Sequence, residues 1–270
     1  MNKSFPHSKN ARSRIIGIFI ALFLFIGTTL SFALFDEIGR VFEGADAVKD
    51  MAEGFSGVSV EQELDIGGSL ALEIAARNGG ILKDAEITKR VATIGKALSL
   101  YCKRPELKFT FGVLDNPDVN AISAPGGYVF VTKGLVDACK DDQQLAGVLA
   151  HEIVHITQRH ALKRISGSKG TKGVLKALSA SGQNFSGFDD LISKGINEFV
   201  EKGLPPGDEF DADKGGTTLA YDAGFQPQGL RDYLKKLSDK DHQKTFCTHP
   251  KTKERVKRLD RYLEESGILD

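Results

Sequence analysis

Two histidines and a glutamate stand at a spacing that suits metal chemistry, within the stretch LAGVLAHEIVHITQRHALKR. In a helix, residues four apart lie about 40° from each other, so the rings of His151 and His155 point to one side. That arrangement suits a zinc ion, which histidine nitrogens bind well. Glu152 lies beside the same face and can take a proton from a water molecule that attacks a polarised carbonyl. The H-E-x-x-H pattern therefore indicates zinc-dependent hydrolysis with Glu152 as the general base.

The residues around this pattern argue against a chance occurrence. Apolar side chains surround it at Val148, Ile153, Val154 and Ile156. They indicate a buried helix, in which histidine and glutamate side chains without partners would cost folding free energy. A zinc ion would supply the partner. The alternative is three polar residues that happen to fall on one helix.

A catalytic zinc ion usually takes three protein ligands and leaves a fourth position for water, so a third ligand must come from elsewhere. On a continuing helix His160 points about 140° away from His155, and we expect it to form hydrogen bonds at a helix end instead. Glu209 and Asp213, in EFDAD, stand four apart on a predicted helix. One could bind zinc while the other orients a ligand histidine, or both could belong to a solvated acidic helix start. Spacing alone leaves both readings open.

Several blocks of the sequence together resemble a known family. They are NAISAPGGYVFVTKGL, LAGVLAHEIVHITQRH, EFDAD, AGFQPQGL and THPKTKERVKRL, in that order. The order resembles the gluzincins of metallopeptidase family forty-eight, the HtpX-like and CAAX-prenyl-endopeptidase-like zinc peptidases. Within that family the likeness is to the soluble periplasmic branch of BepA-like and LoiP-like proteases, which is related to the Oma-type proteases.

The resemblance implies a set of residues for the active site. His151, His155 and Glu209 are the implied ligands of one zinc ion (Zn2+) per chain. Glu152 is the implied catalytic base, and Asp213 matches the acid that supports the site.

Two further positions follow from the same resemblance. His249, in the matching HP block, would either stabilise the oxyanion or cap the open zinc position. Arg255 follows at the family's spacing and would pair with carboxylates of the active site. The chain departs from the family at LPPGDEF, where Ser-Arg often precedes the third ligand, so local contacts there are not implied.

The resemblance also implies how substrate binds. Gluzincins bind substrate as an added strand along an exposed sheet edge, where main-chain hydrogen bonds demand little of the substrate's sequence. The residues expected to line that edge are Asn120, Ala121, Gly126, Gly127, Tyr128, Val129, Phe130 and Val131. The alternative is an ordinary hairpin that binds no ligand.

The apolar pattern predicts the elements that position these residues. Predicted helices cover residues 60–80, 83–102, 141–165, 207–224, 228–238 and 251–266, and predicted strands cover residues 107–114 and 127–134. Residues 166–207, rich in Gly, Ser and Lys, would form a mobile lid or a surface insertion. The expected fold class is α+β and mostly helical. It has a zincin-like core with a small sheet beside the H-E-x-x-H helix and with C-terminal helices.

The N-terminus predicts export. A basic leader precedes an uncharged apolar run at residues 15–35. Its small-x-small end predicts a signal peptide over residues 1–33, cleaved after Ala33. The run is also long enough to remain as an N-terminal membrane anchor. Residues 34–57 would be a flexible lead-in and residues 58–270 the zinc metallopeptidase domain. In either case the body of the chain would be exported to the periplasm, soluble or anchored to the inner membrane.

Composition narrows the class of protein. Lys plus Arg and Asp plus Glu both number 36 in 270 residues, so the formal net charge is zero. The sequence lacks the basic stripe that nucleic-acid binding needs. The three cysteines are too few for a disulfide-dense scaffold.

The expected function is that of a zinc metalloendopeptidase that cleaves unfolded or misassembled cell-envelope proteins. One alternative is an envelope chaperone or assembly factor that binds the same proteins with its zinc capped and largely inactive. A second is a structural zinc protein, which would use four protein ligands. A complete H-E-x-x-H pattern with its glutamate argues against this second alternative. The sequence does not indicate an oligomeric state.

Overall fold

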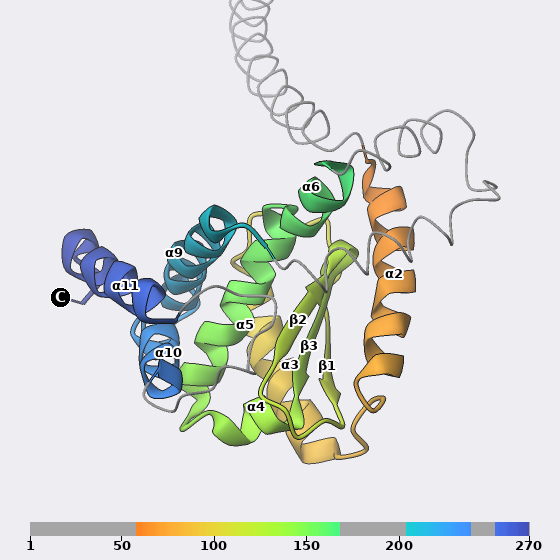
Figure 1. Ribbon diagram of the computed structural model, residues 1–270, viewed down its shortest axis with the longest axis horizontal. Coiled ribbons are helices and arrows are strands. Elements are labelled where there is room, and N and C mark those ends of the chain that lie inside the picture. Colours follow the sequence, from red (N-terminus) through yellow and green to blue (C-terminus); the bar gives the residue numbers. More distant parts are fainter. Residues whose placement is uncertain (1–57, 168–203, 239–251, 270) are drawn as a thin grey trace, which may run out of the picture. The chain divides into compact units, whose positions relative to one another are not determined.

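The structure is a computed structural model, and it describes residues 58–167, 204–238 and 252–269 (Figure 1). The fold is α+β and mostly helical, as expected. Its helices are α2 (Val60–Arg77), α3 (Ala85–Ser99), α4 (Lys133–Ala138), α5 (Asp142–Thr157), α6 (His160–Gly167), α9 (Pro206–Asp222), α10 (Gly229–Ser238) and α11 (Thr252–Ser266). Its strands are β1 (Thr110–Leu114), β2 (Ala121–Ala124) and β3 (Tyr128–Thr132), and a short 3-10 turn, η1 (Pro125–Gly127), joins β2 to β3.

The three strands form one sheet in the order β1-β3-β2. β3 pairs in parallel with β1 and antiparallel with β2, so its main-chain groups are used on both sides. The prediction that Gly126, Gly127, Tyr128, Val129, Phe130 and Val131 line an exposed edge is therefore wrong. The first two of these residues lie in η1, and the other four lie in the central strand. Within the described residues, no strand pairs with the outer side of β2, which makes β2 an edge of the sheet.

Each face of the sheet is covered by helices (Figure 1). Side chains alternate between the faces along a strand, and Val129 and Val131 point into a core shared with α3 and α5. Phe130 points into a second core, which it shares with Ile66 and Leu70 of α2. The sheet therefore lies between α2 on one side and α3 and α5 on the other, and α5 carries the H-E-x-x-H residues.

The predicted helix over residues 141–165 is two helices. α5 begins after Asp141, whose side chain accepts a hydrogen bond from the amide of Gln144, and it ends at Thr157. Arg159 adopts a left-handed backbone conformation with φ 55°, and α6 starts at the next residue. A left-handed residue cannot continue a right-handed helix, so the chain changes direction at this point.

The C-terminal helices pack on α5 and on one another. α9 and α10 both lie against α5, and α11 packs on α9 and α10. Gly216 of α9 lies close to the backbone of α5, because a Cβ atom at this position would lie 2.8 Å from the amide nitrogen of His151. The absence of a side chain at Gly216 therefore lets α9 bring its carboxylates close to the histidines of α5.

Several predictions concern segments outside the described residues. They are the signal peptide or anchor over residues 1–33, the lead-in over residues 34–57 and nearly all of the segment 166–207. Across the ranges that the structure does describe, none of the helices is both long and apolar enough to cross a bilayer.

Candidate metal centre

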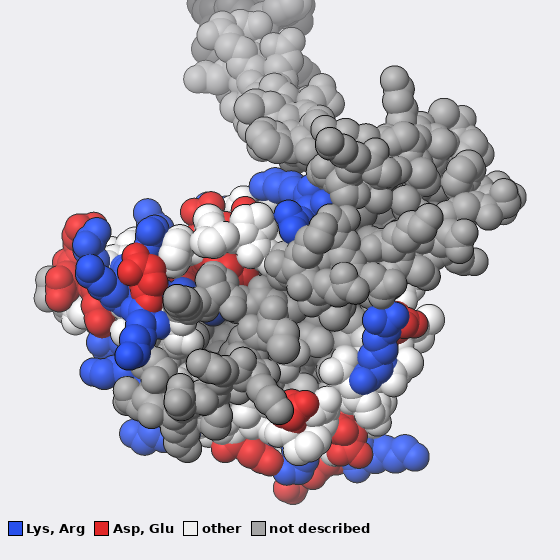
Figure 2. All heavy atoms as spheres, viewed as in Figure 1, with Lys and Arg blue, Asp and Glu red and all other residues white. Residues whose placement is uncertain are grey.

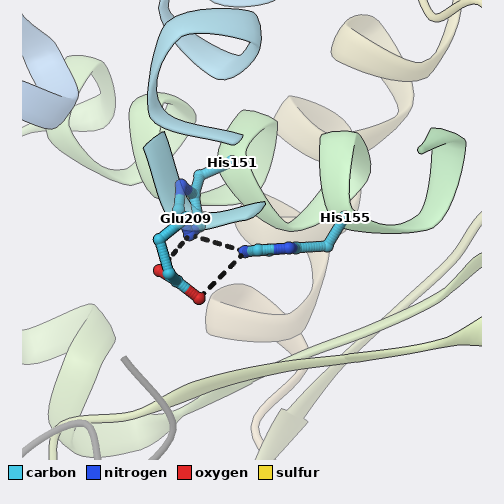
Figure 3. A group of neighbouring side chains, drawn as sticks. All are labelled: His151, His155 and Glu209. Carbon is cyan, nitrogen blue, oxygen red and sulfur yellow. Dashed lines mark hydrogen bonds and ion pairs between the residues drawn. The ribbon is translucent and has the colours of Figure 1, made fainter. Parts of the chain in front are cut away.

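Two helices bring together three side chains that could hold a metal ion (Figure 3). His151 and His155 come from successive turns of α5, and their Nε2 atoms lie 2.9 Å apart. Glu209 comes from the start of α9, and its two carboxylate oxygens each lie 3.6 Å from one of these Nε2 atoms. The candidate ligand atoms of the three residues all lie within 4.8 Å of one another. The structure thus brings together the three residues that the resemblance implied as ligands.

The chemistry of this cluster fits a zinc ion. All three side chains are buried, and Glu209 has no exposed surface at all. Buried ionisable groups are costly unless they are paired or bind a metal. Two imidazoles and one carboxylate are a donor set that zinc accepts in hydrolytic sites, with a further position left for water. Among the described residues, no other cluster of His, Cys, Asp and Glu has this convergence.

Asp213 and Arg255 support the cluster from behind. Oδ1 of Asp213 lies 3.1 Å from Nδ1 of His151, on the side of the ring away from the other ligands. Arg255, from α11, donates hydrogen bonds of 2.8 and 2.6 Å to the two oxygens of Asp213. Burial opposes the charge, but the guanidinium of Arg255 holds the pKa of Asp213 below its usual range. The structure therefore brings both predicted supporting residues to the site.

The pKa of His151 predicts a pH dependence of metal binding. Burial opposes protonation of this ring, but the carboxylates of Asp213 and Glu209 outweigh burial and raise the pKa from 6.5 to about 9. In the metal-free protein the protonated ring stabilises the fold fully below pH 6.5, and this contribution is lost as the pH rises through about 9. A metal ligand must be deprotonated.

We therefore expect the zinc affinity of the metal-free chain to rise about tenfold per pH unit up to about pH 9. Competition with a chromophoric chelator across this range measures the affinity, and thermal unfolding of the metal-free chain checks the loss of stability. An affinity that stays flat below pH 9 would mean that His151 is already neutral in the folded chain.

Glu152 is buried next to the histidines, and sequence reasoning missed its partner. The hydroxyl of Ser123 donates a hydrogen bond of 2.7 Å to Oε2 of Glu152. Ser123 lies in β2, one pleat from Ala121, and the alternation of side chains along a strand points both toward α5. A strand over NAISA would have indicated this contact, but the apolar pattern predicts strands only over residues 107–114 and 127–134.

His160 is the second residue whose role sequence reasoning missed. Its Nδ1 atom lies 2.8 Å from Nδ1 of His155, and its ring is buried. The expectation that it points away from His155 assumed a continuous helix, and the left-handed turn at Arg159 removes that assumption. His160 faces the side of the His155 ring opposite to the Nε2 atom that meets Glu209.

The other predicted site residues fall in different places. Asn120 immediately precedes β2, and Ala121 begins it, close to the helix that carries Glu152. His249 lies outside the described residues, so its predicted role at the oxyanion or as a cap of the zinc position stays a prediction.

The contact between Gly216 and the backbone of His151 predicts a sensitive position. In Gly216→Ala the new methyl group would meet backbone atoms of α5 at 2.8 and 2.9 Å, which forces α9 away from α5. We expect a loss of stability of about 1–3 kcal/mol and a fall of at least about tenfold in zinc affinity. Gly207→Ala, on the same helix, is the control, because no atom lies within 4 Å of its new methyl group. Denaturant unfolding and zinc titration measure the stability and the zinc affinity of both variants. Equal stability and equal zinc affinity in the two variants would contradict the prediction.

The chain has a buried His-His-Glu donor set, and a glutamate follows the first histidine on a helix beside a small sheet. This arrangement is typical of metallopeptidases. The model of peptidase family M48 matches residues 85–263, and the chain belongs to this family.

Relatives with curated names agree with this assignment. The chain is 27% identical over 210 residues to the beta-barrel assembly-enhancing protease of Yersinia pestis, covering 72% of this chain and 42% of that protein. It is 26% identical over 189 residues to the metalloprotease LoiP of Escherichia coli K12, covering 68% and 74%. It is 28% identical over 190 residues to the mitochondrial metalloendopeptidase OMA1 of Schizosaccharomyces pombe, covering 67% and 54%. The chain spans about half the length of the beta-barrel assembly-enhancing proteases that it matches.

Proposed function

We propose that this chain is a zinc-dependent endopeptidase that hydrolyses peptide bonds of unfolded or misassembled proteins of the bacterial envelope. The observation that carries the proposal is the convergence of His151, His155 and Glu209 beside the buried carboxylate of Glu152. Membership of peptidase family M48 supports the same chemistry.

A zinc ion held by these three residues would supply Lewis acidity, which polarises the scissile carbonyl and lowers the pKa of water. Residues of the chain transfer the proton and orient the groups that react. Glu152 accepts the proton of the attacking water and passes it to the amide nitrogen that leaves. The hydroxyl of Ser123 holds one oxygen of this carboxylate on the side of β2. Asp213 orients the ring of His151 through its Nδ1 atom.

We propose that substrate binds as an added strand on β2, in place of the residues first expected. The amide of Thr132 donates a hydrogen bond of 3.0 Å to the carbonyl of Asn120. The main-chain groups of Asn120 therefore point toward β3. Because this direction alternates along an antiparallel pair, the main-chain groups of Ala121 and Ser123 face the outer edge. Both residues are buried, with their side chains directed toward α5, so an added strand would contact their main-chain groups. Only an extended segment can bind in this way, which favours unfolded substrates.

The proposed location rests on the N-terminus and on the relatives. A basic leader followed by an apolar run favours export. The Yersinia pestis relative is named a beta-barrel assembly-enhancing protease, which supports substrates of the envelope for this chain. We propose periplasmic action, with the N-terminal segment either cleaved or kept as an anchor.

The proposed substrate class can be tested with one protein in two states. We expect the chain to cleave reduced, carboxymethylated α-lactalbumin at several sites and to leave native α-lactalbumin intact, since only the unfolded form offers extended segments. Gel electrophoresis and mass spectrometry of the fragments measure both. Equal cleavage of the two states would contradict a preference for unfolded chains. Suppressed aggregation of the unfolded form without cleavage would favour the chaperone alternative.

A further inference from the structure

His160 is a buried histidine that the proposed chemistry does not use. Its side chain is 2% exposed, and its Nδ1 atom lies 2.8 Å from Nδ1 of His155. The two rings meet edge to face, with centroids 5.0 Å apart. His155 thus has a nitrogen partner on each side, because its Nε2 atom faces His151 and Glu209.

A network of buried charges holds the turn that places His160. Arg159, the preceding residue, has its Nε atom 3.3 Å from Oε2 of Glu63 and donates to the carbonyl of Val58 at 3.4 Å. Glu63 belongs to α2 and is fully buried. Its two oxygens also accept hydrogen bonds of 2.8 and 2.9 Å from Nη1 of Arg104. Glu63, which Arg104 holds in place, therefore anchors the side chain of Arg159. The backbone of Arg159 adopts a left-handed conformation that L residues rarely adopt.

The contacts of its two ring nitrogens determine which nitrogen of His155 carries the proton. A neutral imidazole carries one proton, and the nitrogen that binds a metal must offer a lone pair. Nε2 is the nitrogen that faces the other proposed ligands, so the proton belongs on Nδ1. A histidine that binds a metal through one nitrogen usually has a hydrogen-bond partner at the other nitrogen. That partner fixes both the tautomer and the orientation of the ring. At His155 that partner is a histidine nitrogen in place of the more usual carboxylate or carbonyl.

We propose that His160 is a positioning residue for the metal centre: its Nδ1 atom accepts the Nδ1–H of His155 and so keeps Nε2 of His155 directed at the zinc ion. His160 then carries its own proton on Nε2. The inference rests on the proposed zinc site. It assigns His160 an orienting role and no contact with the metal, because its Nδ1 atom is occupied on the far side of His155.

Two substitutions in the full-length chain separate orientation from packing. His160→Phe keeps a ring of similar size and removes the acceptor, whereas His160→Asn places an amide oxygen close to the position of Nδ1. Competition with a chromophoric chelator gives the zinc affinity of each, and thermal unfolding of the metal-free variants checks the fold. We expect His160→Phe to lose about 10–100-fold in zinc affinity and His160→Asn to stay within about threefold of the parent. Equal losses in both variants, or no loss in either, would overturn the inference.

A measurement on the unsubstituted chain keeps the test independent of folding defects. Long-range 15N–1H correlation spectra of the zinc-loaded protein report which nitrogen of each imidazole carries the proton. We expect the proton of His160 on Nε2 and an accepting Nδ1. A proton on Nδ1 of His160 would overturn the inference while the zinc site stands. A parent chain that binds no zinc would overturn the metal centre itself.

Discussion

We expect the Glu152→Gln variant to bind one zinc ion per chain and to lose cleavage of an unfolded substrate, with kcat lower by about 10²–10⁴-fold. The amide that replaces the carboxylate keeps the shape of the side chain and can still accept the hydrogen bond from the hydroxyl of Ser123. It cannot take a proton from the attacking water. The expected defect is therefore in kcat, with zinc content unchanged, and steady-state kinetics on casein together with atomic absorption measure both.

Asp142→Asn is the matched control for this prediction. It makes the same chemical change on the same helix, but Asp142 is exposed at the start of α5 and pairs with Arg90. We expect activity and zinc content close to those of the parent. Cleavage that survives in Glu152→Gln would mean that another group acts as base. An activity absent from the parent as well would favour the chaperone alternative.

The Arg255→Ala variant is expected to lose about 3–5 kcal/mol of stability, because it leaves the buried charge of Asp213 without its guanidinium partner. The pair is 4% exposed on both sides and joins α11 to α9 directly behind His151. Zinc affinity should fall as well, since Asp213 would no longer be held against the ring of His151. Denaturant unfolding of the zinc-loaded and metal-free proteins measures the two effects separately.

An exposed ion pair provides the comparison for Arg255. Arg77 and Glu73 stand one turn apart on α2, and their side chains are 47% and 41% exposed. Arg77→Ala removes the same kind of group and should change stability by less than about 1 kcal/mol. If Arg255→Ala has an equally small effect, the charge of Asp213 must be neutralised in some other way.

The local parts of the site could be predicted from sequence. The spacing of His151 and His155 places both rings on one side of a helix whatever the rest of the chain does, and the structure has them there. The amphipathic helices followed from their apolar periodicity for the same reason. The role of Glu209 could not be predicted in this way, because its distance from α5 depends on how two helices pack. The spacing of Glu209 and Asp213 alone did not decide whether Glu209 is a metal ligand. The resemblance to a family supplied that expectation.

The parts that could not be predicted depend on long-range order or on single backbone angles. Strand order decides which strand is the edge, and β3 became central because β1 pairs with it from the other side. No local pattern in residues 126–131 encodes this. The place of His160 depends on one left-handed residue, Arg159, held by Glu63 from a helix far away in the sequence. A helical projection that runs straight through residues 151–160 gives the wrong side.

The most direct test of the account is to follow zinc and cleavage in the same preparation of the full-length chain. We expect one zinc ion per chain, cleavage of casein that disappears when a chelator removes the metal, and recovery of both when zinc is restored. A folded chain that binds no zinc, or cleavage that persists after the metal is removed, would contradict a catalytic zinc ion at His151, His155 and Glu209.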